Sequence, residues 1–502
     1  MDLSRHDENP SANTRAARPA IATASMFLIG CLTFAGMLSS AIPFLILGSG
    51  ICLIAIIALL WTTEEPPILL LPALFQWSEV ALVPISTVWL RVPLAELSEN
   101  GADLNASALY GLLGVLSLAV GMKVGSLKKA SKAASFSDRI RYEAMRWPQS
   151  KVFQSSAALI LAGYVFAALM FSVGPLREPF GQAANVKYIG IFMLAYWCLL
   201  TGRSQGVLAF VIGFEIVIGM TGFFAEFKDT ILTFFVAALF AKPRVRAFDL
   251  LITTFAAVLI LGVAIFWSAI KPDYRDFMNN GTGAQTVGVP MNERIDFIGN
   301  SISSFDGDKL QDGFQRLVSR HGYIEYLGLV MQNVPQAVPF QDGQITASVI
   351  KHITVPRLIW KEKPALPSDT EVMSKYTGLP MTWNSDTSIS IGYLGELYAD
   401  FGYLGGLVAA SLIGLLIGLC YRAVSNNRRS SELARAGLCL MLVLPIAYFG
   451  TAYVKLIGSY VMTAIIVLIL LNFVFPRFFR NSEMIDASLV DGTKSDRKFS
   501  RI

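Results

Sequence analysis

The chain has 502 residues, of which 54% are hydrophobic and 15% charged, and its mean hydropathy is +0.54. Soluble globular domains average about 25% charged residues, so this composition excludes an ordinary soluble enzyme or binding module. The formal net charge of +5 comes from Lys and Arg that flank apolar runs. That pattern reports membrane topology, and we expect no nucleic-acid partner.

Apolar runs recur along the whole chain. A bilayer core of roughly 30 Å needs about 20 consecutive helical residues, and the runs meet this length. A transmembrane β-barrel would instead show short segments of alternating hydrophobicity. The sequence therefore predicts an all-α polytopic integral membrane protein.

The first half of the chain is predicted to hold a polar cytoplasmic tail, residues 1–20, and nine transmembrane helices within residues 21–270. The third run contains three prolines, which predict a kink, and one ionisable group at membrane depth, Glu79. The nine runs lie at residues 21–41, 43–61, 67–90, 106–122, 152–173, 188–202, 205–223, 229–241 and 249–270.

A strongly basic connection lies between the fourth and fifth runs, at residues 123–151. Short loops rich in Lys and Arg stay on the cytoplasmic side of the membrane. The basic surface of this loop also suits anionic lipid head groups. Its basic residues are Lys123, Lys128, Lys129, Lys132, Arg139, Arg141, Arg146 and Lys151.

Residues 271–390 form the one long hydrophilic segment. Within it, apolar residues recur at helical spacing and predict a single amphipathic helix with Asp312 near its start. The residues of its apolar face are Phe314, Leu317, Val318, His321, Ile324, Gly328 and Met331.

Three further spans are predicted at residues 391–421, 436–453 and 460–476, followed by a polar tail at 477–502. Twelve crossings with the 123–151 loop inside place both termini in the cytoplasm. They place the 271–390 segment on the extracytoplasmic face. The hydropathy shows no inverted repeat, which disfavours the commonest transporter architectures.

Basic side chains in the long segment are candidate phosphate ligands. Arg357 and Lys363 are bracketed by Pro356 and Pro364 near the next span, and Arg316 and Arg320 are four residues apart on the predicted helix. Arg binds phosphate with two parallel hydrogen bonds, and Lys supplies a point charge. The alternative is that these cations are solvated loop residues that balance nearby carboxylates.

Two residue types are candidates for acid–base chemistry. Glu396 and Asp400 are four residues apart at the head of the tenth span, where an unpaired charge is costly. Glu396 would be a general base, or it would form a salt bridge that holds the loop down. The pKa of a histidine suits catalysis near neutral pH, yet the spacing of His321 also fits a packing residue.

Ionisable groups in or near the spans are functional candidates or internal ion pairs; they are Glu79, Glu215, Glu226, Lys228, Asp229 and Lys455. The sequence contains no metal-ligand cluster and no glycine-rich nucleotide loop, so we expect no metal and no other cofactor.

The order of spans and motifs resembles the bacterial O-antigen (Wzy-type) polymerases, also called oligosaccharide repeat unit polymerases. The resemblance is best over residues 311–421. It rests on the long external segment, on Pro-Arg-x-x-Trp-x-x-Lys-Pro at 356–364, and on Gly-Glu-Leu-Tyr-x-x-Phe-Gly at 395–402.

The resemblance implies a metal-independent, GT-C-like glycosyltransferase in the bacterial inner membrane. Its partner would be an oligosaccharide on undecaprenyl pyrophosphate, with a chain-length regulator as a possible protein partner. Arg357, and with it Arg320, would contact the pyrophosphate, and Tyr398 would lie in the substrate site. The alternatives are a flippase or transporter of lipid-linked glycans, an O-antigen ligase that uses His321, and a non-catalytic assembly protein.

Overall fold

The computed structural model describes residues 26–62, 64–128, 135–172, 176–221, 227–241, 247–281, 288–355, 367–380 and 389–479, with the side chains at 171, 220, 221, 247–260 and 320 excepted. Within these residues all regular secondary structure is helical, as α-, 3₁₀- or π-helix, and no strand is formed. This agrees with the all-α class predicted from the sequence.

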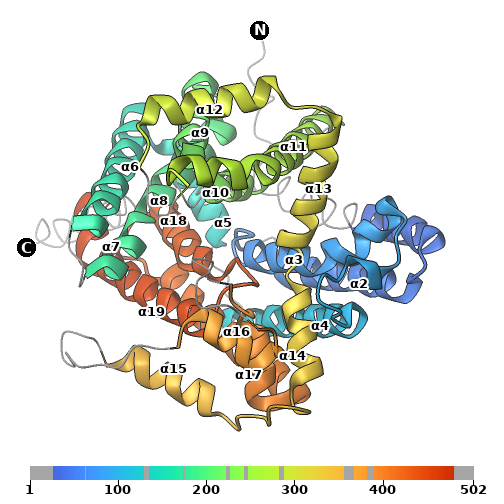
Figure 1. Cartoon of the computed structure of the whole chain (residues 1–502). Helices are drawn as coiled ribbons and strands as arrows, with labels where there is room; N and C mark the ends of the chain where they lie inside the picture. The colour runs from blue at the N-terminus through green and yellow to red at the C-terminus, as the bar shows by residue number, and fades with distance from the viewer. Residues whose placement is uncertain are drawn as a thin grey trace, which may run out of the picture.

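The first half of the fold is a series of helices joined by short connections (Figure 1). After a helix at Met26–Ser39 come α2 (Pro43–Leu60), α3 (Leu70–Leu90), η1 (Leu94–Leu97), α4 (Leu104–Ser126), α5 (Phe136–Arg146), α6 (Gln149–Ser172), α7 (Arg177–Ala184), α8 (Val186–Thr201), α9 (Gln205–Thr221), α10 (Phe227–Ala241) and α11 (Ala247–Met278).

The long hydrophilic segment folds into five helices, and the chain then returns to apolar helices. The five are α12 (Met291–Ser303), α13 (Gly307–His321), α14 (Ile324–Asn333), α15 (Gln344–Thr354) and α16 (Asp369–Thr377). They are followed by α17 (Tyr393–Asn426), α18 (Glu432–Val443), η3 (Leu444–Ile446), α19 (Tyr453–Ile469), the π-helical turn η4 (Leu470–Val474) and α20 (Phe475–Phe478).

Seven helices in the described part of the chain are long and apolar enough to cross a membrane. Their outward faces carry large exposed apolar side chains; on α17 these recur about every four residues at Leu404, Val408, Leu412 and Leu416. Soluble monomers rarely expose a continuous apolar face of this kind, whereas lipid covers it. The long helices therefore indicate a helical membrane protein.

Each of the twelve predicted spans contains a helix, but the predicted boundaries differ from the observed ones. The stretch 436–453 is wrong as one continuous helix, because α18 ends at Val443 and residues 447–452 form a non-helical connection before α19. Some of the predicted spans contain helices that are too short to cross a bilayer, such as the helix at Met26–Ser39.

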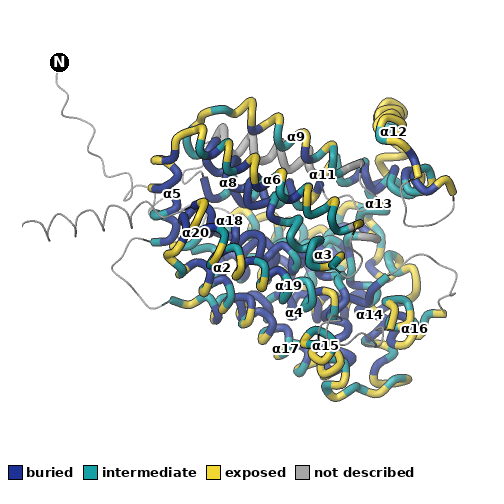
Figure 2. Tube along the Cα trace, turned by 90° about the vertical axis from the view of Figure 1, so that its left-hand side faces the viewer, coloured by how far each residue is buried: buried dark blue, intermediate teal, exposed yellow. Residues whose placement is uncertain are grey.

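The helices of the long polar segment gather at one end of the bundle (Figure 2). In that view α12, α13, α14 and α16 lie to the right, and α5 from the basic 123–151 loop lies at the opposite end. The two segments therefore lie at opposite ends of the bundle, and the side of the membrane that each faces stays a prediction.

The closest helix packing joins α4 to α17. A Cβ added at Gly121 would lie 2.0 Å from the backbone oxygen of Ser411, and one added at Gly414 would lie 2.1 Å from the oxygen of Leu118. Small residues let helix backbones approach within van der Waals contact, which replaces the hydrophobic effect as the packing force in lipid. This pair forms the centre of the lower half of the fold in Figure 1.

A kink at Gly402 divides α17 into a buried head and a long apolar stem. Gly402 has φ 72° and ψ −167°, a conformation that is essentially restricted to glycine. The kink separates the polar head, which begins at Tyr393, from the stem that faces outward at Leu404 and beyond. The excess length predicted for the tenth span is therefore a separate, buried helical head.

Candidate functional site

The predicted amphipathic helix breaks at Gly322–Tyr323, so the single helix spanning Phe314 to Met331 is wrong. It begins at Gly307, with the side chain of Asp306 accepting a hydrogen bond from the Lys309 amide at 2.9 Å. A Cβ at Gly322 would lie 2.0 Å from a methyl group of Val83 on α3. The chain breaks there because it packs directly onto α3.

Tyr323 fastens this break between α3 and the head of α17. Its backbone N–H donates to the carbonyl of Glu79 at 3.1 Å, and its hydroxyl donates to the carbonyl of Ser390. Its ring lies against Gly450, where a Cβ would come within 2.8 Å of ring carbons. Burial raises the pKa of the Tyr323 phenol, so it stays a neutral donor.

His321, the last residue of α13, is held against α3. Its Nε2 lies 3.0 Å from Oγ of Ser78, and its ring meets Phe75 edge-on with centroids 5.2 Å apart. Because the Ser78 hydroxyl donates to the carbonyl of Phe75 at 2.7 Å, the imidazole Nε2 carries the proton and Nδ1 is the acceptor.

The environment of His321 favours the neutral imidazole. Burial, and secondarily the charge of Lys228, lower its pKa from 6.5 to about 4. At neutral pH the ring is therefore uncharged and its Nδ1 can accept a proton. The geometric link between the two residues runs through aromatic rings: Phe75 meets both the His321 ring and the Tyr448 ring, and Lys228 Nζ lies over Tyr448.

Lys228 is exposed at the start of α10 and lies over the ring of Tyr448, with Nζ 3.9 Å from the centroid. The Tyr448 hydroxyl donates to Asp229, the next residue of α10. The Tyr448 ring also packs edge-on against Phe75 of α3. The same ring therefore contacts both Lys228 of α10 and Phe75 of α3. An exposed amine above an aromatic face can attract an anion without first breaking a salt bridge.

Glu79 completes the group from α3. Its side chain is 7% exposed, and its Oε2 accepts a hydrogen bond from the backbone N–H of Phe449 at 2.5 Å. We call Glu79, Lys228, His321 and Tyr448 the junction site, because they lie where α3, α10, α13 and the 447–452 connection meet. It combines an exposed cation, a neutral imidazole and a buried carboxyl group.

Glu396, a predicted catalytic residue, lies in a structural position. It is 6% exposed, and its Oε1 accepts from the backbone N–H of Tyr453 at 2.9 Å, which caps the N-terminus of α19. This contact is a backbone hydrogen bond, and the predicted general-base role of Glu396 stays a prediction. Nearby, Lys455 pairs with Asp369 at 2.5 Å and ties α19 to α16.

Asp400 caps a second helix in the same manner. It is fully buried and accepts from the backbone amides of Gly343 at 2.9 Å, Ile345 at 3.1 Å and Thr346 at 2.9 Å. The Thr346 hydroxyl adds a fourth bond at 2.7 Å. A carboxylate at a helix N-terminus satisfies otherwise orphaned N–H groups and complements the helix dipole. Asp400 therefore holds α15 onto the head of α17.

Tyr398 and Arg316 are separate from the junction site. Tyr398 is buried among Tyr110 and Phe340, and its hydroxyl donates to the carbonyl of Val334 at 3.3 Å. The Arg316 side chain is 41% exposed and pairs with Asp312 on the preceding turn at 2.8 Å. Their predicted substrate contacts remain predictions.

The other predicted phosphate ligands lie outside the described residues. Arg357 and Lys363 fall within 356–366, and only the backbone of Arg320 is described, within α13. His321 and the α17 head are brought together through Tyr323 and through Tyr393, whose hydroxyl donates to Gln76 at 2.8 Å. No group of three His, Cys, Asp or Glu side chains in the described part of the chain is placed to hold a metal ion.

Sequence reasoning named Glu79 on α3 but missed Gln76, Ser78 and Tyr448. Gln76 and Ser78 interrupt an apolar run beside Glu79, and this polar cluster within a span was the available signal. Tyr448 had no such signal, since one tyrosine near an apolar run is ordinary.

Comparison of the chain with known protein families, with curated proteins and with solved structures found no match. The functional argument therefore depends on the residues and geometry described above.

Proposed function

We propose that the chain is a bacterial inner-membrane glycosyltransferase that polymerises lipid-linked oligosaccharide repeat units. The observation that carries the proposal is the junction site. The long polar segment there delivers a neutral imidazole, His321, to an apolar helix beside the exposed amine of Lys228. The site adjoins helices that face lipid, where a polyprenyl pyrophosphate carrier resides.

The proposed reaction needs two groups that the junction site contains. A hydroxyl of the acceptor sugar attacks the anomeric carbon of the donor glycan, the new C–O bond forms, and the bond to the lipid pyrophosphate breaks. Lys228 stabilises the charge that develops on the departing pyrophosphate. His321 Nδ1 accepts the proton of the attacking hydroxyl.

The low pKa of free His321 fits this sequence of events. Lys228 helps to depress that pKa. A bound pyrophosphate neutralises the field of Lys228, so the imidazole becomes more basic once the donor is in place. Arg357, Lys363, Arg320 and Arg316 would add cationic contacts to the pyrophosphate, and Tyr398 would line the sugar path.

The fold and sequence support an extracytoplasmic site. The polar helices lie at the end of the bundle opposite the basic loop, and we propose that both termini face the cytoplasm. The product would be a surface polysaccharide such as O-antigen or exopolysaccharide, and a chain-length regulator would be the natural protein partner.

The test uses the purified full chain in vesicles with repeat units on undecaprenyl pyrophosphate. We expect a ladder of longer glycans and release of lipid pyrophosphate. Lys228→Met should lower the transfer rate by about 10²-fold or more, as loss of one electrostatic contact to a developing charge does. The matched control is Lys309→Met, which removes an exposed lysine on a different helix, α13.

A transporter gives a different result in the same vesicles. It would move the lipid-linked glycan across the bilayer without forming a longer glycan, and Lys228→Met would leave chain length unaffected. In cells, loss of a polymerase should leave single repeat units on the outer surface, whereas loss of a flippase should trap them facing the cytoplasm. Either transporter outcome would refute the polymerase proposal.

A further inference from the structure

A stripe of exposed apolar side chains runs along the last candidate membrane span, which comprises α19, η4 and α20 (Tyr453–Phe478). Ile465, Ile469 and Phe473 follow one another at intervals of four residues and are 46%, 49% and 65% exposed. Side chains at this spacing are neighbours on one face of a helix. We call these three residues the α19 stripe. In a membrane protein such an outward apolar surface is covered by lipid.

The α19 stripe ends at a group of exposed arginines. Arg477, in α20, follows Phe473 by four residues and continues the same face. Arg429, in the connection between α17 and α18, donates from Nη1 to Oδ1 of Asn472 at 3.2 Å, which places its guanidinium beside η4. Arg428 is its exposed neighbour in the chain. We call Arg428, Arg429 and Arg477 the stripe arginines.

The α17–α18 connection is held against α20 by two further contacts. The backbone N–H of Ser431 donates to the carbonyl of Phe479 at 2.7 Å, and the Phe479 ring stacks on Trp147 with centroids 6.2 Å apart. Figure 2 shows α5, α18 and α20 together at one end of the bundle. The arginines of the connection and of α20 therefore belong to one surface at that end.

This surface carries charge of a single sign. Neither residues 427–431 nor residues 470–479 include an Asp or a Glu. The next carboxylate along the chain, Glu432, is buried and paired with Arg435, so it does not neutralise the exposed cations. An apolar strip that ends in uncompensated positive charge is matched by a ligand with an apolar tail and an anionic head.

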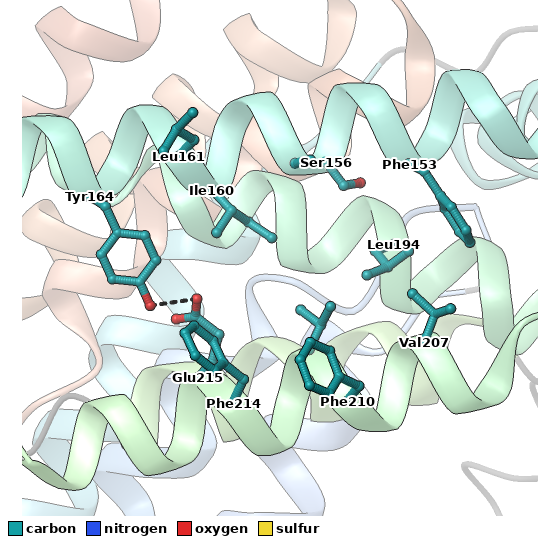
Figure 3. A pocket seen from close by; sticks show the side chains of 12 residues that line it. Phe153, Ser156, Ile160, Leu161, Tyr164, Leu194, Val207, Phe210, Phe214 and Glu215 are labelled. Atoms are coloured by element: carbon teal, nitrogen blue, oxygen red, sulfur yellow. Dashed lines mark hydrogen bonds between the residues drawn. The ribbon is translucent and has the colours of Figure 1, made fainter.

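Apolar exposure alone does not select a head group, as the groove between α6, α8 and α9 shows (Figure 3). Phe210 on its rim is exposed, and at its polar end Glu215 accepts a hydrogen bond from the Tyr164 hydroxyl at 2.7 Å. Among the described residues that line this groove there is no Lys or Arg. The α19 stripe differs because cations stand at its end.

We propose that the α19 stripe and its arginines bind one anionic phospholipid, of which phosphatidylglycerol is the simplest example. One acyl chain lies along Phe473, Ile469 and Ile465, and the phosphate lies against Arg477 and Arg429. Residues 465–477 rise roughly 18 Å along the helix. This is close to half of a hydrocarbon core of roughly 30 Å, so the stripe matches the acyl chain of one leaflet.

The arrangement favours this occupant over three others. Guanidinium groups bind phosphate with parallel hydrogen bonds, whereas the ammonium of a zwitterionic head would be repelled by the same cations. Free phosphate has no apolar part to cover the stripe. A second copy of the chain keeps the same orientation in the membrane, so it would bring its own arginines to the same level. The inference depends neither on the proposed glycosyltransferase activity nor on which side of the membrane this end faces.

The experiment measures lipid binding to the purified full chain by native mass spectrometry. Phosphatidylglycerol, phosphatidylethanolamine and phosphatidylcholine are compared with identical acyl chains. Each arginine near an anionic head group contributes about fivefold in affinity. With three arginines, we expect one phosphatidylglycerol per chain, bound about 10²-fold more tightly than phosphatidylcholine.

Arginine variants assign the head group. The combined variant Arg428→Gln, Arg429→Gln and Arg477→Gln should bind phosphatidylglycerol and phosphatidylcholine equally. Arg477→Gln alone should lose about fivefold of the preference. Its matched control is Arg203→Gln, which removes an exposed arginine from the connection between α8 and α9 and should keep the full preference.

A pair of phenylalanine variants assigns the acyl chain. Phe473→Ala should weaken the binding of all three lipids while the preference for phosphatidylglycerol remains. Phe210→Ala removes an exposed ring from the groove in Figure 3 and should leave phosphatidylglycerol binding unchanged. This pair keeps the test decisive if the combined arginine variant does not fold.

Several outcomes would overturn the proposal. These are equal binding of the glycerol and choline lipids to the unmodified chain, equal losses in Arg203→Gln and Arg477→Gln, and displacement of phosphatidylglycerol by inorganic phosphate. A dimer in the mass spectra that dissociates in Phe473→Ala would show that a second copy covers the stripe, and it would overturn the proposal as well.

Discussion

Two groups of charged residues in this protein differ in how their charges are paired. The paired cluster, formed by Arg139, Glu143, Glu432 and Arg435, joins α5 to the start of α18. Arg435 is fully buried, pairs with Glu432 and donates to the carbonyl of Ser425 at 2.7 Å. Arg139 lies 3.2 Å from Glu432 on the other side.

Glu143 completes the paired cluster by capping α18. Its Oε2 accepts from the backbone N–H of Leu433 and from the hydroxyl of Ser431, both at 3.0 Å. The junction site contains the same kinds of group, but its cation, Lys228, is exposed and its histidine is held neutral. Pairing between opposite buried charges indicates a structural role. An exposed charge beside an uncharged base indicates a place for a ligand.

The largest expected effect tests the structural side of this comparison. Arg435→Met leaves Glu432 buried with one partner fewer, and removing one member of a buried ion pair costs about 3–5 kcal/mol. Unfolding of the purified protein in detergent measures the loss. Arg428→Met, an exposed arginine of the same connection, is the control. Equal stabilities for the two variants would refute the structural role of the cluster.

The second prediction concerns Asp400, whose buried carboxylate accepts four hydrogen bonds from backbone amides and a hydroxyl group. In Asp400→Asn one carboxylate oxygen becomes an NH₂ group, which cannot accept and faces N–H and O–H donors. We expect a loss of about 2–3 kcal/mol in unfolding free energy, together with faster proteolysis near α15. Asp342→Asn should be silent, since that residue is exposed and Asn tolerates its left-handed backbone. Unchanged proteolysis of Asp400→Asn would contradict the capping role.

The third prediction uses the pKa of His321, about 4 in the fold against an ordinary value of 6.5. Between these values the unfolded chain binds the extra proton, so stability is present above pH 6.5 and is lost as the pH falls toward 4. We expect His321 to account for about 1–3 kcal/mol of this loss. His321→Gln should flatten the curve of unfolding temperature against pH. Parallel curves for the variant and the wild type would show that His321 is not buried as described.

The smallest expected effect completes the comparison. Lys228→Met should change the unfolding free energy by less than about 0.5 kcal/mol, because an exposed charge contributes little to stability. The same variant should lose most of its transfer activity. A large loss of stability would instead show that Lys228 has a structural role, and it would contradict the role of Lys228 in the proposed reaction.

The sequence by itself determined the helical membrane class and the approximate position of the apolar segments. Composition and run length suffice for this, because every backbone group in lipid must be bonded within a helix or a closed barrel. It also identified Glu79, Lys228 and His321 as unusual, since each is a polar side chain in or beside an apolar stretch.

Only the tertiary structure decided what those residues contact. Gly322 after Arg320 and His321 is a local stop signal, and the close packing of Gly322 against Val83 of α3 is visible only in the tertiary structure. Glu396 and His321 were equal candidates in sequence. Glu396 caps the backbone of α19, whereas His321 is linked to the exposed Lys228 through the rings of Phe75 and Tyr448. The partners of these side chains come from helices that are distant in the chain. Hydrophobic periodicity indicates which face of a helix is buried, but it does not indicate which other helix that face contacts.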